Sequence, residues 1–213
     1  MQPKRIPPKP SSAEVSNWQK IWSGNTAFKP AEDTLEKLFL QYSRNIDIVE
    51  IYAKVIILNT LYSTYIENKY LLKVAEHIQS IKNIDMRIKN NDPTVVDDIA
   101  DTDKIIGRRC CSFATKYCSF HNPNSYPIYD KFVEETLRYF NAQYCFTQKI
   151  NMQYSLARKN FYDEFFAKNS KNTYADWKAI IDDFVGFPNF NINGKNYKDI
   201  DRYLWQLGKD LFL

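Results

Sequence analysis

Asp130 is the residue of this sequence best placed to do chemistry, because it ends a proline-containing loop and begins a helical pattern. The loop reads HNPNSYPIYD, in which Pro123 and Pro127 stiffen the chain. The dipole of the following helix favours an ionised carboxylate. A fixed anion beside Tyr126 and Tyr129 suits a reaction that passes through a sugar cation. The alternative role for the aspartate is a helix N-cap and nothing more.

A stripe of cations and hydroxyl groups lies shortly before this loop. A helical projection of residues 107–120 separates an apolar half, which includes three cysteines, from a polar half. The polar half consists of Arg108, Arg109, Ser112, Thr115, Lys116 and Ser119. Such groups in one row suit a phosphate backbone. The alternative is a solvated surface whose cations pair with the acidic stretch 97–103.

The helical pattern over residues 46–66 supplies candidates for a ligand pocket. Its charged residues share one narrow arc and are Asp47, Glu50 and Lys54. The rest of the circumference is apolar, so we expect a central, buried helix. Asn59 falls opposite the charges, and a buried carboxamide needs partners. Either a neighbouring backbone satisfies Asn59, or Asn59, Tyr62 and Ser63 form a pocket wall.

Trp205 lies outside the apolar face of the helix expected over residues 197–208. Its neighbours on that side are Lys198, Arg202 and Lys209. An indole among cations can stack on a base while the cations bind phosphate. The alternative is that Trp205 packs against another helix or against the amino-terminal tail.

Composition limits the class of protein. The chain has 213 residues, of which 44% are hydrophobic and 25% charged, as in ordinary globular proteins. Only 5 residues are glycine, which argues against β-barrels, β-sandwiches and glycine-rich phosphate loops. The net charge is +4, and three of the positive charges belong to Lys4, Arg5 and Lys9. Contact with nucleic acid must therefore come from a local patch.

Cysteine usage and hydropathy favour a cytoplasmic protein without membrane contact. No signal peptide and no stretch of eighteen apolar residues is present. The cysteines show no disulfide spacing and are Cys110, Cys111, Cys118 and Cys145. Cys111, Cys118 and His121 are the only set that suggests a metal, but no CxxC pair supports it, so we expect neither a metal nor a cofactor.

Periodicity and capping residues predict an all-α fold. Residues 1–11 form a basic, proline-rich tail that we expect to be extended and mobile, and residues 12–213 form one helical domain of two interlocked lobes. Roughly nine helices are expected. They lie near 31–43, 46–66, 68–82, 94–101, 107–120, 130–142, 155–169, 174–186 and 197–208. One turn or short hairpin is expected at 187–196, with Asn193-Gly194 at its tip. We expect a monomer.

The order of these features over residues 45–145 resembles the helix-hairpin-helix DNA glycosylase superfamily. A buried helix containing a polar residue leads to a short turn that ends in Gly107-Arg108-Arg109, and an amphipathic helix follows. The next loop closes with Pro127-Ile128-Tyr129-Asp130-Lys131-Phe132-Val133. In that superfamily a hairpin and a helix precede a proline-containing loop and the essential aspartate.

The sequence departs from the family pattern in several places. The family hairpin carries two glycines, whereas only Gly107 is present here. Members with lyase activity carry a lysine where this chain has Arg109, which cannot form a Schiff base; Lys116, seven residues later on the same helical face, is the substitute amine. No four-cysteine cluster follows, and Asp130 lies a few residues further from the hairpin than usual.

The resemblance implies a monofunctional glycosylase that extrudes a modified or damaged base from double-stranded DNA. Asp130 would stabilise the sugar cation. The base pocket would consist of Asn59, Tyr62, Ser63, Tyr126 and Tyr129, and the DNA backbone would be held by Gly107, Arg108, Arg109, Ser112 and Lys116. The alternatives are a nucleic-acid-binding module without catalysis and a protein-interaction component of a defence or stress system.

Overall fold

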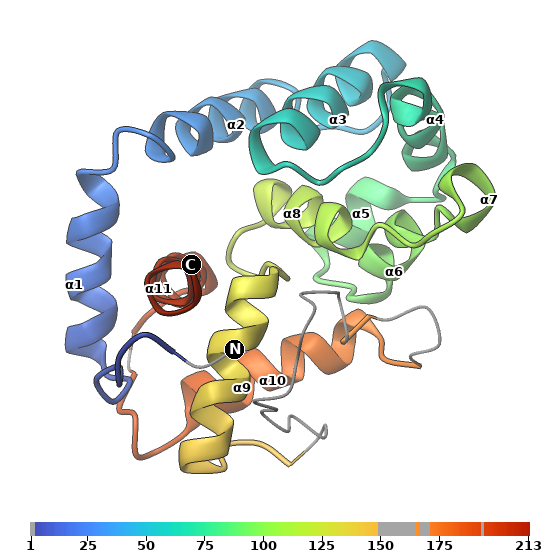
Figure 1. The fold of residues 1–213 in the computed structure, drawn as a ribbon. Helices are drawn as coiled ribbons and strands as arrows, with labels where there is room; N and C mark the ends of the chain where they lie inside the picture. The colour runs from blue at the N-terminus through green and yellow to red at the C-terminus, as the bar shows by residue number, and fades with distance from the viewer. Residues whose placement is uncertain (1–2, 149–164, 167–170, 193) are drawn as a thin grey trace. The chain divides into compact units, whose positions relative to one another are not determined.

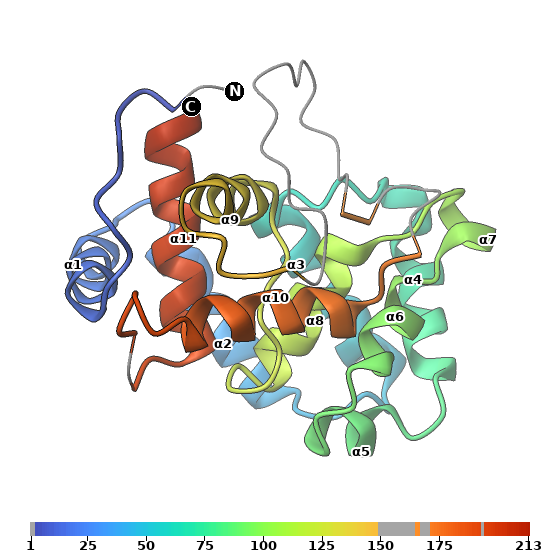
Figure 2. The ribbon, with the colours of Figure 1, turned by 90° about the horizontal axis from the view of Figure 1, so that it is seen from below.

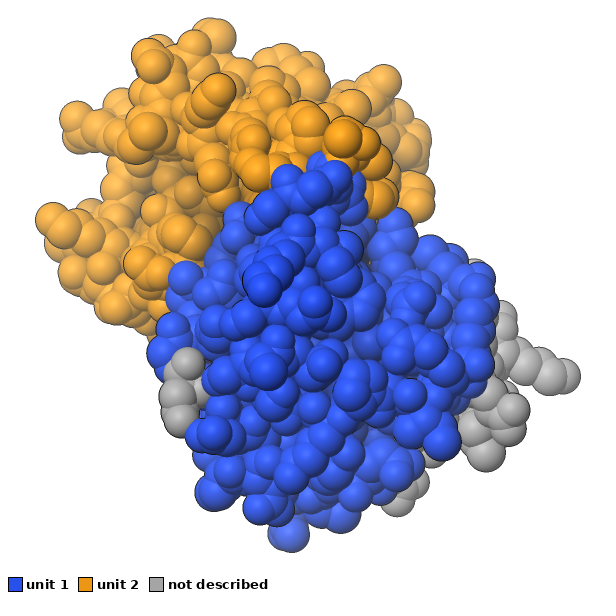
Figure 3. All heavy atoms as spheres, turned by 90° about the vertical axis from the view of Figure 1, so that its left-hand side faces the viewer, with its two compact units in different colours: residues 1–25, 127–213 blue, residues 26–126 orange. Residues whose placement is uncertain are grey.

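Helices are the only regular elements among the residues that the structure, a computed structural model, describes, namely 3–148, 165–166, 171–192 and 194–213 (Figure 1). The prediction of an all-α fold is therefore confirmed. The chain divides into two compact units (Figure 3). The first unit contains Met1–Asn25 and Pro127–Leu213, and the second contains Thr26–Tyr126.

The second unit is built around α3. Its helices are α2 (Lys29–Gln41), α3 (Ile48–Tyr62), the 3-10 helix η1 (Asn68–Tyr70), α4 (Leu71–Ser80), α5 (Ile84–Lys89), α6 (Thr94–Ala100), α7 (Asp103–Ile106) and α8 (Cys111–His121). Helix α3 packs on α2, α4 and α8, while α6 packs on α8. Ile51, Val55 and Leu58 of α3 are fully buried. The central position predicted for this helix is thus confirmed, but its predicted burial is only partial, because Val49 and Leu61 are exposed while Lys54 of the charged arc is buried.

The first unit is built around α9 and α11. Its helices are α1 (Ser12–Ser23), α9 (Lys131–Tyr144), α10 (Tyr174–Gly186) and α11 (Tyr197–Phe212). Both α1 and α9 pack on α11 (Figures 1 and 2). Every residue of α9 from Phe132 to Phe140 is buried. The ring of Phe140 lies 6.0 Å from that of Phe184 and 6.3 Å from that of Phe190, so aromatic side chains tie α9 to α10 and the loop after it.

Side-chain caps fix where the longer helices begin. Asp47 and Asp130 accept hydrogen bonds from amides in the first turns of α3 and α9. Thr173 and Asp176 form a reciprocal capping box at the start of α10. Each cap satisfies amides that have no partner within the helix and contributes about 1 kcal/mol. The helix starts predicted from Asp130 and Thr173 are confirmed.

Left-handed backbone conformations explain two differences between the predicted and observed helices. The pattern predicts one helix over residues 46–66, but α3 ends at Tyr62 because Ser63 has a φ of 48°. Gly107 has a φ of 82° and separates α7 from α8. For this reason α8 begins at Cys111 and not at residue 107.

Three helices are absent from the predicted set. Helices α5 and α7 have 6 and 4 residues, too few for a periodicity to show. In α1 only Val15 and Trp22 are buried, which leaves a weak apolar pattern. The helix predicted over residues 155–169 lies outside the described residues except for Phe165 and Phe166. The described part of 187–196 forms turns without a strand, and Gly194 has a φ of 68°.

The basic tail is tied to the end of α11. The amide of Lys4 donates to the Leu211 carbonyl at 3.0 Å, and Arg5 forms an ion pair with Asp210 at 2.7 Å. Pro7, further along the tail, is buried. The segment expected to be mobile is therefore held against α11 at Lys4 and Arg5.

Replacing Gly208 with alanine should destabilise the protein. A Cβ atom there would lie 2.6 Å from the carbonyl oxygen of Phe132 and 2.7 Å from Oγ1 of Thr136, because α11 and α9 touch at this position. Forced separation of packed elements costs about 1–3 kcal/mol. The expected result is a lower midpoint of urea-induced unfolding.

The matched control is Gly186→Ala in α10. Gly186 is exposed, and nothing lies within 4 Å of the position that its Cβ would take. Alanine there should leave the free energy of unfolding unchanged or raise it by up to about 1 kcal/mol. A Gly208→Ala protein as stable as this control would contradict the close approach of α9 and α11.

Candidate functional site

The residues predicted to form the site are distributed over both compact units. Tyr129, Asp130 and Trp205 lie in the first unit. The second unit holds the others, which are Asn59, Tyr62, Ser63, Gly107, Arg108, Arg109, Ser112, Lys116 and Tyr126. Each unit therefore carries its own part of the predicted site.

Asp130 stands at the N-cap of α9. Its Oδ1 accepts a hydrogen bond from the amide of Phe132 at 2.9 Å, and the side chain is partly exposed. Because α9 is buried from Phe132 to Phe140, the carboxylate is mounted on a rigid element. The structure thus confirms the role as a cap and also presents a fixed, partly exposed anion.

A lysine of α11 lies within electrostatic reach of Asp130 and also contacts an indole. The Lys209 Nζ lies 4.5 Å from the centre of the Trp205 ring. Burial lowers the pKa of Lys209, while the charge of Asp130 raises it and that of Lys131 lowers it further. Lys209 therefore links Asp130 and Trp205 electrostatically. Trp205 also meets the Trp22 ring edge-on at 5.9 Å, which confirms its predicted packing against another helix.

The turn between α7 and α8 corresponds to the predicted hairpin. Gly107 is exposed, and no atom beyond its chain neighbours lies within 4 Å of the position that a Cβ would take. Cys110, at the N-cap of α8, provides no side-chain hydrogen bond to the helix. A phosphate oxygen can approach an open backbone before a helix N-terminus of this kind. Gly107 therefore stands in a left-handed conformation in an exposed turn that leads into α8, and a phosphate-binding role for this turn stays a prediction.

The two arginines after Gly107 both have partners within the second unit. Arg108 is exposed and donates through one Nη to the carbonyls of Thr64 and Tyr65, at 3.3 and 2.9 Å. Arg109 forms an ion pair with Asp97 at 2.8 Å. The predicted pairing of this stripe with the acidic stretch 97–103 is therefore confirmed for Arg109.

The polar half of α8 is mostly buried, which corrects the solvent-facing stripe expected from the projection. Thr115 is fully buried, and Lys116 and Ser119 are each 2% exposed. The Lys116 Nζ donates to the Ser112 Oγ at 2.7 Å and lies 5.8 Å from the centre of the Tyr62 ring. A projection considers one helix at a time, so it cannot show that neighbouring elements cover the polar half.

Asn59 fastens the loop that follows α3. Its Nδ2 donates to the carbonyl of Ile66 at 3.0 Å, and its Oδ1 accepts from the Ile66 amide at 3.0 Å and the Thr64 hydroxyl at 2.8 Å. The alternative in which a neighbouring backbone satisfies this side chain is confirmed. Tyr62, beside it, is half-buried, and Ser63 is exposed.

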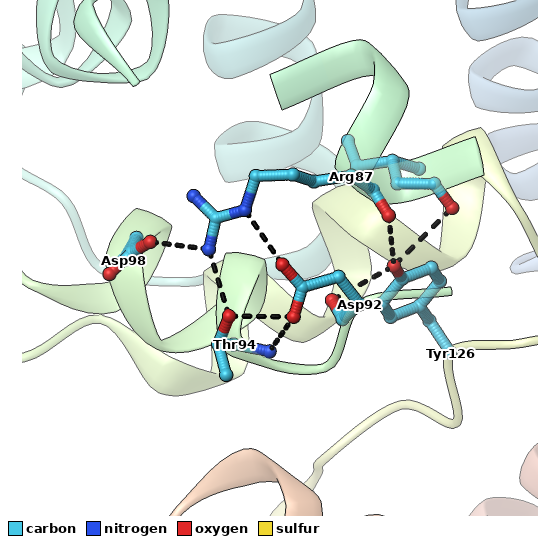
Figure 4. A network of polar contacts seen from close by, with 6 residues as sticks. Arg87, Asp92, Thr94, Asp98 and Tyr126 are labelled. Atoms are coloured by element: carbon cyan, nitrogen blue, oxygen red, sulfur yellow. Dashed lines mark hydrogen bonds and ion pairs between the residues drawn. The ribbon is translucent and has the colours of Figure 1, made fainter. Parts of the chain in front are cut away.

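The two tyrosines of the proline-containing loop are buried. Tyr126 is 1% exposed, and its hydroxyl donates to the carbonyl of Asp92, whose carboxylate pairs with Arg87 (Figure 4). Tyr129 is fully buried, and its hydroxyl donates to the Glu134 Oε2 at 2.6 Å. Both hydroxyl groups are engaged inside their own unit. Their place in a base pocket stays a prediction.

Lys54, which the helical pattern places on the charged arc of α3, is a buried charged group that the sequence analysis did not include in any candidate site. Lys54 is fully buried. Its Nζ donates to the carbonyls of Tyr42 and Arg44 at 2.9 and 3.0 Å and to the Asn45 Oδ1 at 2.8 Å. Two of these acceptors are backbone carbonyls of another segment. Every residue has a backbone carbonyl, so the sequence could not predict these partners of Lys54.

His121 and Asp85 complete the network around Lys54. The His121 Nε2 lies 3.3 Å from the Lys54 Nζ, and Asp85 accepts from the backbone amide and the side chain of Asn45. The Tyr117 hydroxyl also donates to the Asn45 Oδ1, which accepts from Lys54 as well. Burial lowers the pKa of Lys54 to about 8. Burial and the charge of Lys54 together lower the pKa of His121 to about 3.

The structure also bears on metals, thiols and membranes. In the described part of the chain, no three His, Cys, Asp or Glu side chains gather as metal ligands would. None of the cysteines is in a disulfide; Cys110, Cys111 and Cys118 are buried, and Cys145 is exposed. None of the described helices is at once long enough and apolar enough to span a bilayer.

Comparison with known proteins gives a family match over residues 13–125 and similarity to a relative over most of the chain. Residues 13–125, more than half of the chain, match the family model HI_0787_N, described as an N-terminal domain. A Haemophilus influenzae protein named "Uncharacterized protein" is 37% identical over 156 residues, or 72% of this chain and 64% of its own length. No solved structure matches. The family match includes the hairpin at Gly107 and ends before Asp130.

His121 should stay neutral in the folded protein until the pH falls to about 3. The chain has 2 histidines, so His77 provides a second signal in the same NMR titration. Lys54→Met removes the neighbouring charge and should raise the midpoint of His121, because burial alone then opposes protonation. A His121 midpoint near 6.5 in the unaltered protein would contradict the network.

The same titration predicts how stability depends on pH. Between the folded pKa of about 3 and the ordinary value of 6.5, unfolded His121 binds a proton that folded His121 does not. The contribution of His121 to stability is therefore present above pH 6.5 and is lost as the pH falls toward 3. Urea unfolding at a series of pH values measures this loss.

Proposed function

We propose that this chain, which belongs to the HI_0787_N family, is a DNA glycosylase that releases a modified or damaged base from double-stranded DNA. The observation that carries the proposal is the Asp130 carboxylate, held by the Phe132 amide at 2.9 Å and partly exposed at the start of a buried helix. A carboxylate fixed in advance stabilises a positively charged sugar without having to reorganise.

The proposed reaction is hydrolysis of the N-glycosidic bond. The target nucleotide leaves the base stack, the bond between the sugar C1′ and the base nitrogen breaks, and its electron pair leaves with the base. A water oxygen then bonds to C1′, and its proton neutralises the released base. Asp130 stabilises the sugar cation and orients the water. Water is the only co-reactant, and we propose no cofactor.

The hairpin supports binding of the DNA backbone. The space around the α carbon of Gly107 is open, although its amide already donates to the Asp103 carbonyl, and exposed Arg108 adds a positive charge next to it. Ser112, half-buried in the first turn of α8, contributes a hydroxyl group. A guanidinium group and a hydroxyl group are among the donors from which phosphate oxygens commonly accept hydrogen bonds.

The group around Lys209 supports contact with DNA by the first unit as well. Lys209 lies against the Trp205 ring and within electrostatic reach of Asp130. A cation and an aromatic ring beside the proposed catalytic carboxylate suit a phosphate and a base of the same strand. Trp205 would then contact DNA with the part of its ring that Trp22 does not meet.

The proposed setting is the cytoplasm, where the partner is DNA. Cys110, Cys111 and Cys118 are buried and form no disulfide. A reducing compartment keeps such thiols from forming disulfides. The proposed reaction requires only one copy of the chain, and we propose that the protein acts as a monomer.

A specific observation favours nucleic-acid binding without catalysis as the second candidate function. The hydroxyls of Tyr126 and Tyr129 and the carboxamide of Asn59 already have partners in the fold. Groups bonded in this way must exchange partners before they can recognise a base. A binding module needs the hairpin and the cations but not a base pocket.

Asp130→Asn should abolish base release without unfolding the protein. Asparagine caps helices as well as aspartate does, so the variant keeps α9 but loses the charge. Loss of one preorganised stabilising group slows such a reaction by about 10²–10³-fold. The assay is single-turnover release of free base from duplexes that each carry one oxidised, alkylated, deaminated or hypermodified base.

The matched control is Asp47→Asn, because Asp47 caps α3 in the same way but lies in the second unit. This variant should release base as fast as the unaltered protein does. Full activity of Asp130→Asn would overturn the catalytic assignment. No base release from any duplex of the panel, together with salt-dependent DNA binding, would instead favour the binding module.

Base release is expected to leave the DNA strand intact. A lyase needs an amine that attacks C1′, but Arg109 cannot form a Schiff base and pairs with Asp97. Lys116 is buried and donates to Ser112. Borohydride should therefore trap no covalent complex with substrate DNA. A trapped complex would contradict this, and the variants Lys116→Gln and Lys209→Gln would identify the amine.

A further inference from the structure

The loop between α3 and η1 presents an aromatic ring to solvent. Tyr65 is 83% exposed, whereas its neighbours Thr64 and Ile66 are 8% and 3% exposed. Ser63 and Tyr65 have φ values of 48° and 58°, in the left-handed region that residues other than glycine rarely adopt. The ring therefore points outward from a backbone conformation that is unfavourable for its own residue.

Hydrogen bonds from two directions hold this conformation. From α3, the Asn59 side chain bonds to both backbone groups of Ile66 and to the Thr64 hydroxyl, at 2.8–3.0 Å. From the turn before α8, Arg108 donates to the carbonyls of Thr64 and Tyr65. A strained backbone persists only where its surroundings determine it in this way, and such places cluster at binding sites.

A rigid, exposed tyrosine is suited to binding. It gains little stability from the fold, and its ring loses little freedom when a ligand covers it. Arg108 uses one Nη for the loop, while a guanidinium group has five N–H donors, so it retains donors for a further acceptor. Gly107, whose backbone is open, directly precedes Arg108.

We propose that Tyr65 and Arg108 form a contact site for an unpaired nucleotide, in which the tyrosine ring stacks on the base and the guanidinium group binds its phosphate. Every nucleobase has a face on which a ring can stack, and the positive charge of Arg108 complements the backbone. The inference rests on the proposed action on DNA and adds a preference, namely for DNA that contains an unpaired base.

The test compares two labelled duplexes of one sequence, fully paired or with a one-nucleotide bulge, by fluorescence anisotropy with the full chain. Tyr65→Ala should weaken binding to the bulged duplex about 10-fold and affect the paired duplex less. Tyr65→Phe keeps the ring and should bind as the unaltered protein does. Arg108→Gln should weaken binding to both duplexes and reduce the salt dependence by about one phosphate contact.

Val49→Ala is the matched control, because Val49 is 71% exposed in the same unit but lies at the other end of α3. It should leave both affinities unchanged. With 2-aminopurine as the bulged base, stacking on the ring should quench its fluorescence. The quenching should disappear in Tyr65→Ala and persist in Tyr65→Phe.

Three results would overturn the inference. They are equal affinity of Tyr65→Ala and the unaltered protein for the bulged duplex, an equal loss in Tyr65→Phe and Tyr65→Ala, and no binding of either duplex at low salt. Base release separates this inference from the proposed function. If the protein binds through Tyr65 but releases no base from any substrate, the glycosylase proposal is wrong and the stacking site stands. If it releases base but Tyr65→Ala binds the bulged duplex as well as the unaltered protein does, the stacking site is wrong and the glycosylase proposal stands.

Discussion

The arrangement of the second unit depends on the buried ammonium group of Lys54. A charge without water around it costs several kcal/mol unless acceptors replace its hydration. Here two carbonyls of the α2–α3 loop, the Asn45 side chain and the His121 ring surround the Nζ atom. Lys54 belongs to α3, while its acceptors belong to the α2–α3 loop and to α8. Hydrogen bonding to the Lys54 ammonium group therefore fixes the loop, α3 and α8 against one another. The turn at Gly107 leads directly into α8, and Arg108 of that turn bonds the loop after α3.

In the first unit the corresponding constraint is close packing. Helix α9 is buried along both its apolar and its polar residues, and the Glu134–Arg138 ion pair lies within it. Gly208 allows the backbone of α11 to lie against the first turn of α9. Asp130 directly precedes that turn, so the packing of α11 on α9 also limits the movement of its carboxylate. A site built from Asp130 therefore needs no further loop to hold the anion in place.

Local signals in the sequence were sufficient to predict much of the fold. Asp130 and Thr173 mark helix starts because a cap involves only the next few residues. Periodicity identified α3 and α10 because the apolar face of each is longer than three turns. The burial of Lys54 and Lys116 could not be predicted in this way, since their partners or covering residues come from other elements. For the site, the sequence predicted the cap role of Asp130 and offered backbone partners for Asn59 as one of two alternatives, but it could not show that the Tyr126 hydroxyl is bonded to carbonyls of a distant segment.

The path of the chain through the two units has a consequence for synthesis on the ribosome. The first unit contains both ends of the chain, and Gln19 of α1 bonds to the backbone of Asp199, which lies 180 positions later. When residues up to Tyr126 have emerged, the second unit is complete and can fold. At that moment α11 has not yet been made, so α1 has nothing to pack on. Contacts that distant in sequence form slowly, because closing so long a loop loses entropy before any contact compensates. The order of folding is thus the reverse of the order of synthesis for α1, which is made before the second unit but finds its partner α11 only after that unit is complete.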